Sequence, residues 1–154
     1  MTWVLANLDL IGSRTLSHLV LAVPAIVLSF VLALPLGWVA NRYRWSRATL
    51  LTAAGLLYAI PSLPLFVVLP VIIGIGVRDR LNVIIALTLY GIALMVRSAA
   101  DALASVDAPV RLSSTALGYS AAGRFWQVEL PLAGPVLLAG LRVVSVSTIS
   151  LVTV

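Results

Sequence analysis

The stretch that decides the fold is residues 15–41, which read TLSHLVLAVPAIVLSFVLALPLGWVAN. These 27 residues carry no formal charge. About 20 apolar helical residues suffice to cross the hydrocarbon core of a bilayer. The stretch is longer than the apolar part of a signal peptide, and Arg42, Tyr43 and Arg44 follow it instead of a small-residue cleavage site. We therefore interpret it as a retained transmembrane helix.

Three further apolar blocks follow the first. Residues 48–77 and 81–96 carry no formal charge, and residues 130–154 carry one, Arg142. All are continuous apolar runs, whereas membrane β-strands are short segments of alternating apolar and polar residues. The sequence therefore predicts an all-α polytopic membrane protein with four visible spans.

The composition excludes several other classes of protein. Of 154 residues, 62% are hydrophobic and 10% are charged, against about 45–50% and about 25% in soluble domains. A chain of this size lacks the interior to hide so much apolar surface in water. It has no Cys, one His and five acidic residues, so we expect neither a metal site nor an enzyme. The ten basic residues are all Arg and are scattered along the chain, which does not suit nucleic-acid binding.

The arginines predict the orientation, because cytoplasmic loops of membrane proteins are enriched in basic residues. An external N-terminus places three arginines outside and six inside. The outer three are Arg14, Arg78 and Arg80, and the inner six are Arg42, Arg44, Arg47, Arg97, Arg111 and Arg124. We expect a multi-pass membrane protein with an extracytoplasmic N-terminus.

Proline interrupts the second span, where residues 61–64 read PSLP. Proline removes a helical hydrogen bond, so the span should kink or break there. A kink would serve packing, whereas a broken helix could line a pathway. Polar residues of the spans are candidate pathway residues or, alternatively, helix–helix hydrogen-bonding groups. The candidates are Tyr58, Pro61, Ser62, Tyr90, Arg142, Ser145, Ser147 and Thr148.

Arg142 is the charge that costs most free energy to place within a span. It lies about 16 Å along a helix from Pro131. Its side chain either extends to the cytosolic interface or pairs across helices at a gate. The sequence leaves both interpretations open.

Residues 97–131 form the one long polar segment, with three Arg and three acidic residues. Its net charge is zero, so the segment is not a polybasic lipid-binding patch. We expect a cap at residues 107–109, a short helix over 110–117 that ends at Gly118, and a second over 121–128 that Pro131 stops. Glu129 should pair with Arg124 at the surface, and Asp107 with Arg111.

The spacing within this segment matches a known pattern. Gly118 is followed by nine residues and then by Val128, one residue, Leu130 and Pro131. Three residues separate the glycine from a preceding triplet, Leu112, Ser113 and Ser114. The segment resembles the EAA loop of binding-protein-dependent ABC importer permeases, which docks on the ATPase. Leu112 replaces the acid of that loop, and serines replace its two alanines.

A second resemblance narrows the branch. Residues 60–63 and 128–142 are similar to glycine betaine/carnitine/choline permeases. The resemblance implies a type I importer-like core of five spans, so we expect residues 1–154 to be one permease domain that lacks its C-terminal part. Its coupling loop would be residues 97–131. The implied function is a pathway for compatible solutes.

The resemblance also implies partners. These are a cytosolic ABC ATPase, a second permease copy or paralogue, an extracytoplasmic substrate-binding protein and the lipid bilayer. ATP would bind to the ATPase, so we expect no cofactor on this chain. The alternatives are a permease for methionine, another amino acid or an oxyanion, or a channel or scaffold that needs no nucleotide.

Overall fold

The protein is built from helices in the computed structural model, which describes residues 2–60 and 62–153. The helices are α1 (Thr2–Ala6), α2 (Leu8–Arg42), α3 (Arg44–Ala59), α4 (Ser62–Ile73), α5 (Arg80–Ala104), α6 (Ala108–Ala116), α7 (Ala121–Arg124), the π-helical turn η1 (Phe125–Glu129) and α8 (Leu130–Leu151). Strands are absent from both described ranges. The predicted all-α class is confirmed.

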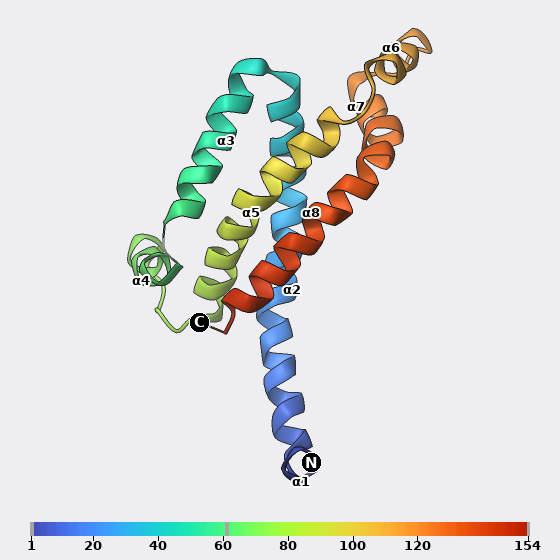
Figure 1. The fold of residues 1–154 in the computed structure, drawn as a ribbon. Coiled ribbons are helices and arrows are strands. Elements are labelled where there is room, and N and C mark those ends of the chain that lie inside the picture. The colour runs from blue at the N-terminus through green and yellow to red at the C-terminus, as the bar shows by residue number, and fades with distance from the viewer. Residues whose placement is uncertain (1, 61, 154) are drawn as a thin grey trace.

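Three helices are long and apolar enough to cross a membrane, namely Leu8–Arg42, Arg80–Ala104 and Ala121–Leu151. The bent pair α3 and α4 makes a fourth span if it is counted as one. Three of the four predicted spans are thus present as single long helices, and the predicted second span corresponds to the bent pair. α2 continues beyond the bundle at its N-terminal end, where it stands apart from the other helices (Figure 1).

α5 is the central helix of the bundle and packs against α2, α3, α4 and α8. Its buried residues include Leu87, Met95, Val96 and Leu103. Figure 1 shows α3 on one side of α5 and α8 on the other. α5 thus contacts α3 and α4, which flank the break in the second span, and also α8, which follows the polar segment in the chain.

Small residues bring α2 and α5 close together. A Cβ atom added at Gly37 would lie 2.5 Å from the Cβ of Ala99 and 3.0 Å from the backbone nitrogen of Ala100. The Ser29 hydroxyl donates a hydrogen bond to the Thr88 carbonyl at 3.1 Å. Close backbone approach and interhelical hydrogen bonds are the usual means of packing helices in membranes.

The second span is broken rather than gently kinked. α3 ends at Ala59, α4 begins at Ser62, and the two helices meet at 103°. The Tyr90 hydroxyl of α5 donates to the Ile60 carbonyl at the break. Asn82 Nδ2 donates to the carbonyls of Phe66 (3.0 Å) and Val77 (3.1 Å), which holds α4 beside the start of α5. Pro61 itself lies outside the described residues.

One predicted boundary is wrong. Pro131 does not stop the helix, which runs without interruption over Ala121–Leu151. Pro131 lies in the first turn of α8, directly after η1, and Leu130 N–H donates to the Phe125 carbonyl five residues back. Pro131 has no N–H to donate, but it lies where the π-helical hydrogen bonds of η1 change to the α-helical hydrogen bonds of α8. The helix therefore continues through it.

Candidate functional site

The polar segment forms a compact projection at the end of the bundle opposite the N-terminus (Figure 1). α6, α7 and η1, with the turn between α6 and α7, fall within residues 97–131, which the sequence predicts to be a coupling loop, and we keep the name coupling loop for these elements. α6 begins after Asp107 with proline in its first turn, as the sequence predicts. The coupling loop lies beyond α5 and continues directly into α8. The loop is thus continuous with a membrane-length helix.

Gly118 closes the turn between α6 and α7. Its φ angle is +87°, in the left-handed region that favours glycine. Gly118 N–H donates to the Thr115 carbonyl at 3.0 Å, and Tyr119 N–H donates to the Ser114 carbonyl at 3.1 Å. This pair of bonds is a Schellman motif, which confirms the predicted helix end at Gly118. Ser120 caps α7 by accepting from Gly123 N–H at 3.1 Å.

A buried carboxylate holds the coupling loop together. Glu129 is 3% exposed, and its Oε1 lies 2.8 Å from Arg124 Nε and 3.9 Å from Arg111 Nε. The predicted Arg124–Glu129 pair therefore exists, but it is buried rather than at the surface. The predicted Asp107–Arg111 pair is wrong within the described residues, because Arg111 turns toward Glu129 and donates to the Leu103 carbonyl.

The residues matched to the coupling motif lie on both faces of this projection. Leu112 is 71% exposed, Ser113 and Pro131 are exposed, and Val128 and Leu130 are half-buried. Ser114 is buried, and its hydroxyl donates to the Val110 carbonyl at 2.7 Å.

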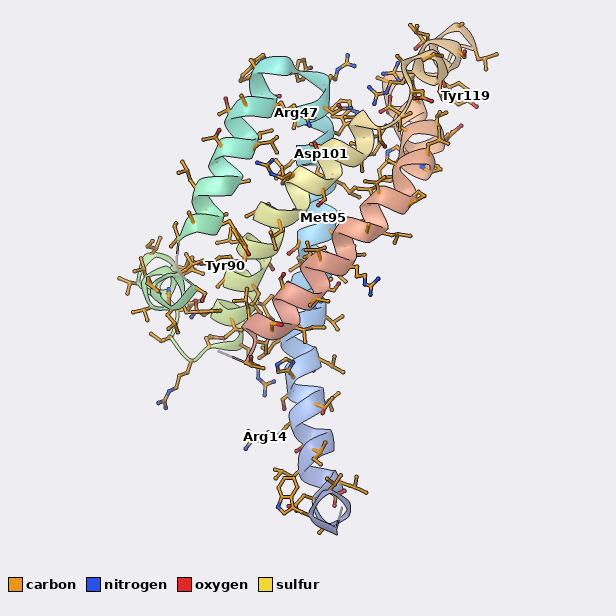
Figure 2. The ribbon with its side chains drawn as sticks, in the orientation of Figure 1. Arg14, Arg47, Tyr90, Met95, Asp101 and Tyr119 are labelled. Carbon is orange, nitrogen blue, oxygen red and sulfur yellow. The ribbon has the colours of Figure 1, made fainter. Side chains whose placement is uncertain are left out.

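Together with Leu112, the neighbouring Leu117 (78% exposed) and Tyr119 give the projection an apolar outer surface. Tyr119 marks this end of the molecule in Figure 2. Contiguous exposed apolar patches mark protein or membrane interaction sites.

Four of the eight candidate pathway residues meet at the second-span break. Tyr58, Ser62, Tyr90 and Ser147 line a cavity of about 270 Å³. The rings of Tyr58 and Tyr90 pack edge to face, with centroids 6.1 Å apart. Figure 2 shows Tyr90 beside α4. The structure thus brings α3, α4, α5 and α8 together around one partly polar cavity.

Three further candidates, Thr148, Ser145 and Arg142, do not line this cavity. Thr148 is buried, and the Ser145 hydroxyl donates to the Leu141 carbonyl at 2.8 Å. Arg142 is exposed and has no carboxylate partner among the described residues. It follows the buried Gly140 by two residues, about 200° around the helix, so it faces away from the bundle. Both interpretations of Arg142 therefore stay predictions.

Two residues of α2 with no predicted site role lie near the coupling loop. The Trp38 ring packs edge to face on Phe125, with centroids 6.2 Å apart. The Arg42 guanidinium carbon lies 5.7 Å from the centroid of the Trp38 ring. The four-residue spacing of Trp38 and Arg42 on one helix is the sequence signal for that second contact. No three His, Asp or Glu side chains gather as a metal site within the described ranges.

Comparison with known proteins gives a consistent result. Residues 33–154 match the family described as binding-protein-dependent transport system inner membrane component. The chain is 33% identical to the osmoprotectant import permease protein OsmW of Salmonella typhimurium, over 99% of this chain and 72% of that protein.

Two Bacillus subtilis permeases are each 28% identical to the chain. The choline transport system permease protein OpuBB matches 84% of this chain, and the glycine betaine/carnitine/choline transport system permease protein OpuCD matches 89%. The chain spans 58% of the length of each of these two relatives.

Proposed function

Because this chain belongs to the family of binding-protein-dependent transport system inner membrane components, we propose that it forms the translocation pathway of an ABC importer for compatible solutes. The solutes would be compounds such as glycine betaine, choline or carnitine, which the relatives' names support. As a transport component it is not an enzyme. Residues 1–154 would act as one permease domain in a bacterial or archaeal inner membrane.

The observation that carries this proposal is the coupling loop. It is a compact projection with exposed Leu112 and Leu117 at one end of the spans, and its glycine lies at the spacing of the EAA loop. A cytosolic ABC ATPase would bind this projection and would also bind the ATP. A second permease copy or paralogue and an extracytoplasmic substrate-binding protein complete the proposed importer.

The geometry supports a mechanical role for the coupling loop. The Schellman turn at Gly118 and the Glu129 ion pairs join α6 firmly to η1, and η1 continues into α8. Closure of the ATPases would therefore move the loop and α8 as one body. Rigid-body movement of packed elements is a common means of switching between two states.

The cavity at the second-span break suits a quaternary ammonium group better than an oxyanion. Tyr58 and Tyr90 supply aromatic rings, α3 ends there with its carbonyl groups, and the described residues that line the cavity include no arginine. Cations are attracted to aromatic faces and to helix C-termini. Methionine, other amino acids and oxyanions therefore fit this cavity less well.

Two substitutions at Gly118 test the coupling role. Valine is disfavoured at φ +87° by about 1–2 kcal/mol, whereas asparagine adopts such angles more readily. A Cβ atom at this position meets nothing within 4 Å, so the two variants differ in backbone strain rather than in clashes. The chain would be reconstituted with its ATPase and binding protein, and ATP-driven uptake of glycine betaine would be measured.

We expect Gly118→Val to lose most uptake while ATP hydrolysis continues, and Gly118→Asn to retain it. Equal membrane content of both variants, measured by immunoblot, controls for folding. Full uptake by the valine variant would overturn the coupling role. Uptake of glycine betaine that persists without ATP would overturn the importer itself.

A further inference from the structure

A cluster of arginines lies where α2 meets the coupling loop. Arg42, Arg111, Arg124 and Glu129 line one polar cavity of about 170 Å³, together with Trp38 and Asn41. Three arginines and one glutamate give this cavity a formal charge of +2. The segment 97–131 is neutral by itself, but the fold adds Arg42 to it. Asp101 does not line the cavity, and its Oδ1 forms an ion pair with Arg47 Nη2 at 2.5 Å.

The positive charge of this cluster is not fully compensated within the described residues. Glu129 is engaged by Arg124 at 2.8 Å and lies 3.9 Å from Arg111. Arg111 Nε is buried and has no hydrogen-bond acceptor. Arg42 is exposed and has no carboxylate partner among these residues. A buried donor without an acceptor costs free energy that an added anion would recover.

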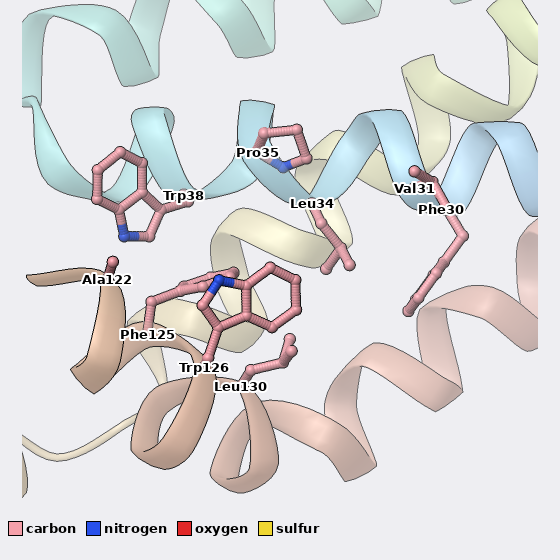
Figure 3. A pocket seen from close by; sticks show the side chains of 9 residues that line it. All are labelled: Phe30, Val31, Leu34, Pro35, Trp38, Ala122, Phe125, Trp126 and Leu130. Carbon is pink, nitrogen blue, oxygen red and sulfur yellow. The ribbon is translucent and has the colours of Figure 1, made fainter.

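An apolar hollow of about 640 Å³ adjoins the polar cavity, and Trp38 lines both. Phe30 and Leu34 form its α2 side, and Phe125, Trp126 and Leu130 form the opposite side. Figure 3 shows these two rows of side chains facing each other across the hollow. The hollow has almost no polar lining, whereas the adjoining cavity is mostly charged.

Along α2, the polar cavity and the apolar hollow follow each other in the same order as the headgroup and the acyl chains of a phospholipid. Arg42 lies one turn beyond Trp38, at the end of the helix. From Trp38 to Phe30 the helix rises about 12 Å, most of the roughly 15 Å depth of one leaflet's hydrocarbon. The charged groups are thus at the headgroup level, a tryptophan is at the interface, and the apolar hollow runs into the membrane.

We propose that this paired site binds one anionic phospholipid of the adjacent leaflet. Its phosphate lies against Arg42, Arg111 and Arg124, and an acyl chain fills the hollow. Basic pockets between helices at the membrane surface are suited to anionic headgroups, and a zwitterionic lipid would leave the net charge of +2 uncompensated. The lipid joins α2 to the coupling loop, and this inference does not depend on which solute is transported.

Tryptophan quenching tests the site, because Trp38 and Trp126 line the hollow. Trp3 and Trp45, which are exposed elsewhere, would first be replaced in a Trp3→Phe/Trp45→Phe background. The full chain in nanodiscs would receive phosphatidylglycerol with brominated acyl chains, or brominated phosphatidylcholine at the same mole fraction. We expect brominated phosphatidylglycerol to quench the remaining fluorescence more strongly.

A matched pair of variants tests whether the preference for phosphatidylglycerol depends on the arginine cluster. Arg42→Gln should weaken phosphatidylglycerol binding about fivefold, which corresponds to about 1 kcal/mol for one basic residue near a lipid surface. Arg14→Gln removes the same charge from the other end of α2 and should change nothing. Circular dichroism of each variant controls for folding.

Three results would overturn the proposal. Equal quenching by the two brominated lipids would mean that the hollow takes any lipid. Displacement of phosphatidylglycerol by inorganic phosphate would mean that the cluster is a site for free anions. Absence of quenching by either lipid, together with cross-linking of the hollow to a second copy of the chain, would mean that protein covers it.

Discussion

Glu129 shows how one residue determines the shape of the coupling loop. In an α-helix, Arg124 and Glu129 would point about 140° apart, but the i to i+5 bonding of η1 brings residues five apart onto nearly one face. The carboxylate is thereby buried beside Arg124 and near Arg111. The sequence predicted the partner correctly but not the burial, because it carries no clear signal for a π-helical turn.

Replacement of Glu129 by glutamine should loosen the coupling loop. The change keeps the shape of the side chain and removes the charge, which should cost about 1.5–3 kcal/mol for the lost charge-assisted hydrogen bond. Trypsin cleaves after arginine, so cleavage after Arg111 and Arg124 should become faster in Glu129→Gln. Asp107→Asn is the control, because Asp107 belongs to the same segment and has no ion pair among the described residues. Equal cleavage rates in the two variants would contradict the role of Glu129.

At the scale of elements, helix packing depends on close approach between α2 and α5. Gly37→Leu would place a side chain where Ala99 and the backbone of Ala100 already lie, and backbone cannot move aside cheaply. Overpacking of this kind typically costs about 1–3 kcal/mol. We expect a lower thermal unfolding midpoint in detergent, measured by circular dichroism. Gly12→Leu is the control on the same helix, because no atom lies within 4 Å of a Cβ there. A Gly37→Leu variant with an unchanged midpoint would contradict this packing.

The spans were predictable, whereas their interruptions were predictable only in part. Long uncharged runs must be helical in a bilayer, so residues 15–41 and 81–96 indicated α2 and α5 directly. Residues 61–64 indicated an interruption, but the choice between a kink and a 103° break depends on tertiary contacts such as Tyr90 with Ile60. The arginine cluster could not be predicted, because Arg42 meets Arg111 and Arg124 only through folding.

At the scale of the whole molecule, several arginines gather at the end that carries the coupling loop. Figure 2 shows Arg14 toward the N-terminal end, and Arg47 and Tyr119 toward the end that carries the coupling loop. Arg42, Arg111 and Arg124 also lie at the coupling-loop end. Since basic residues favour the cytoplasmic side, this asymmetry supports an extracytoplasmic N-terminus. It also matches the coupling role, because an ATPase can reach the loop only from the cytosol.

This orientation can be tested with single cysteines, because the chain has none. Gly76 lies in the exposed turn between α4 and α5, and Ala116 is exposed on α6. In spheroplasts, a membrane-impermeant maleimide should label Gly76→Cys at once, but Ala116→Cys only after permeabilisation. The cysteine-free chain controls for background labelling. The reverse pattern would place the coupling loop outside and would remove the basis for its contact with a cytosolic ATPase. Labelling of both positions in intact spheroplasts would contradict the proposed arrangement of the spans.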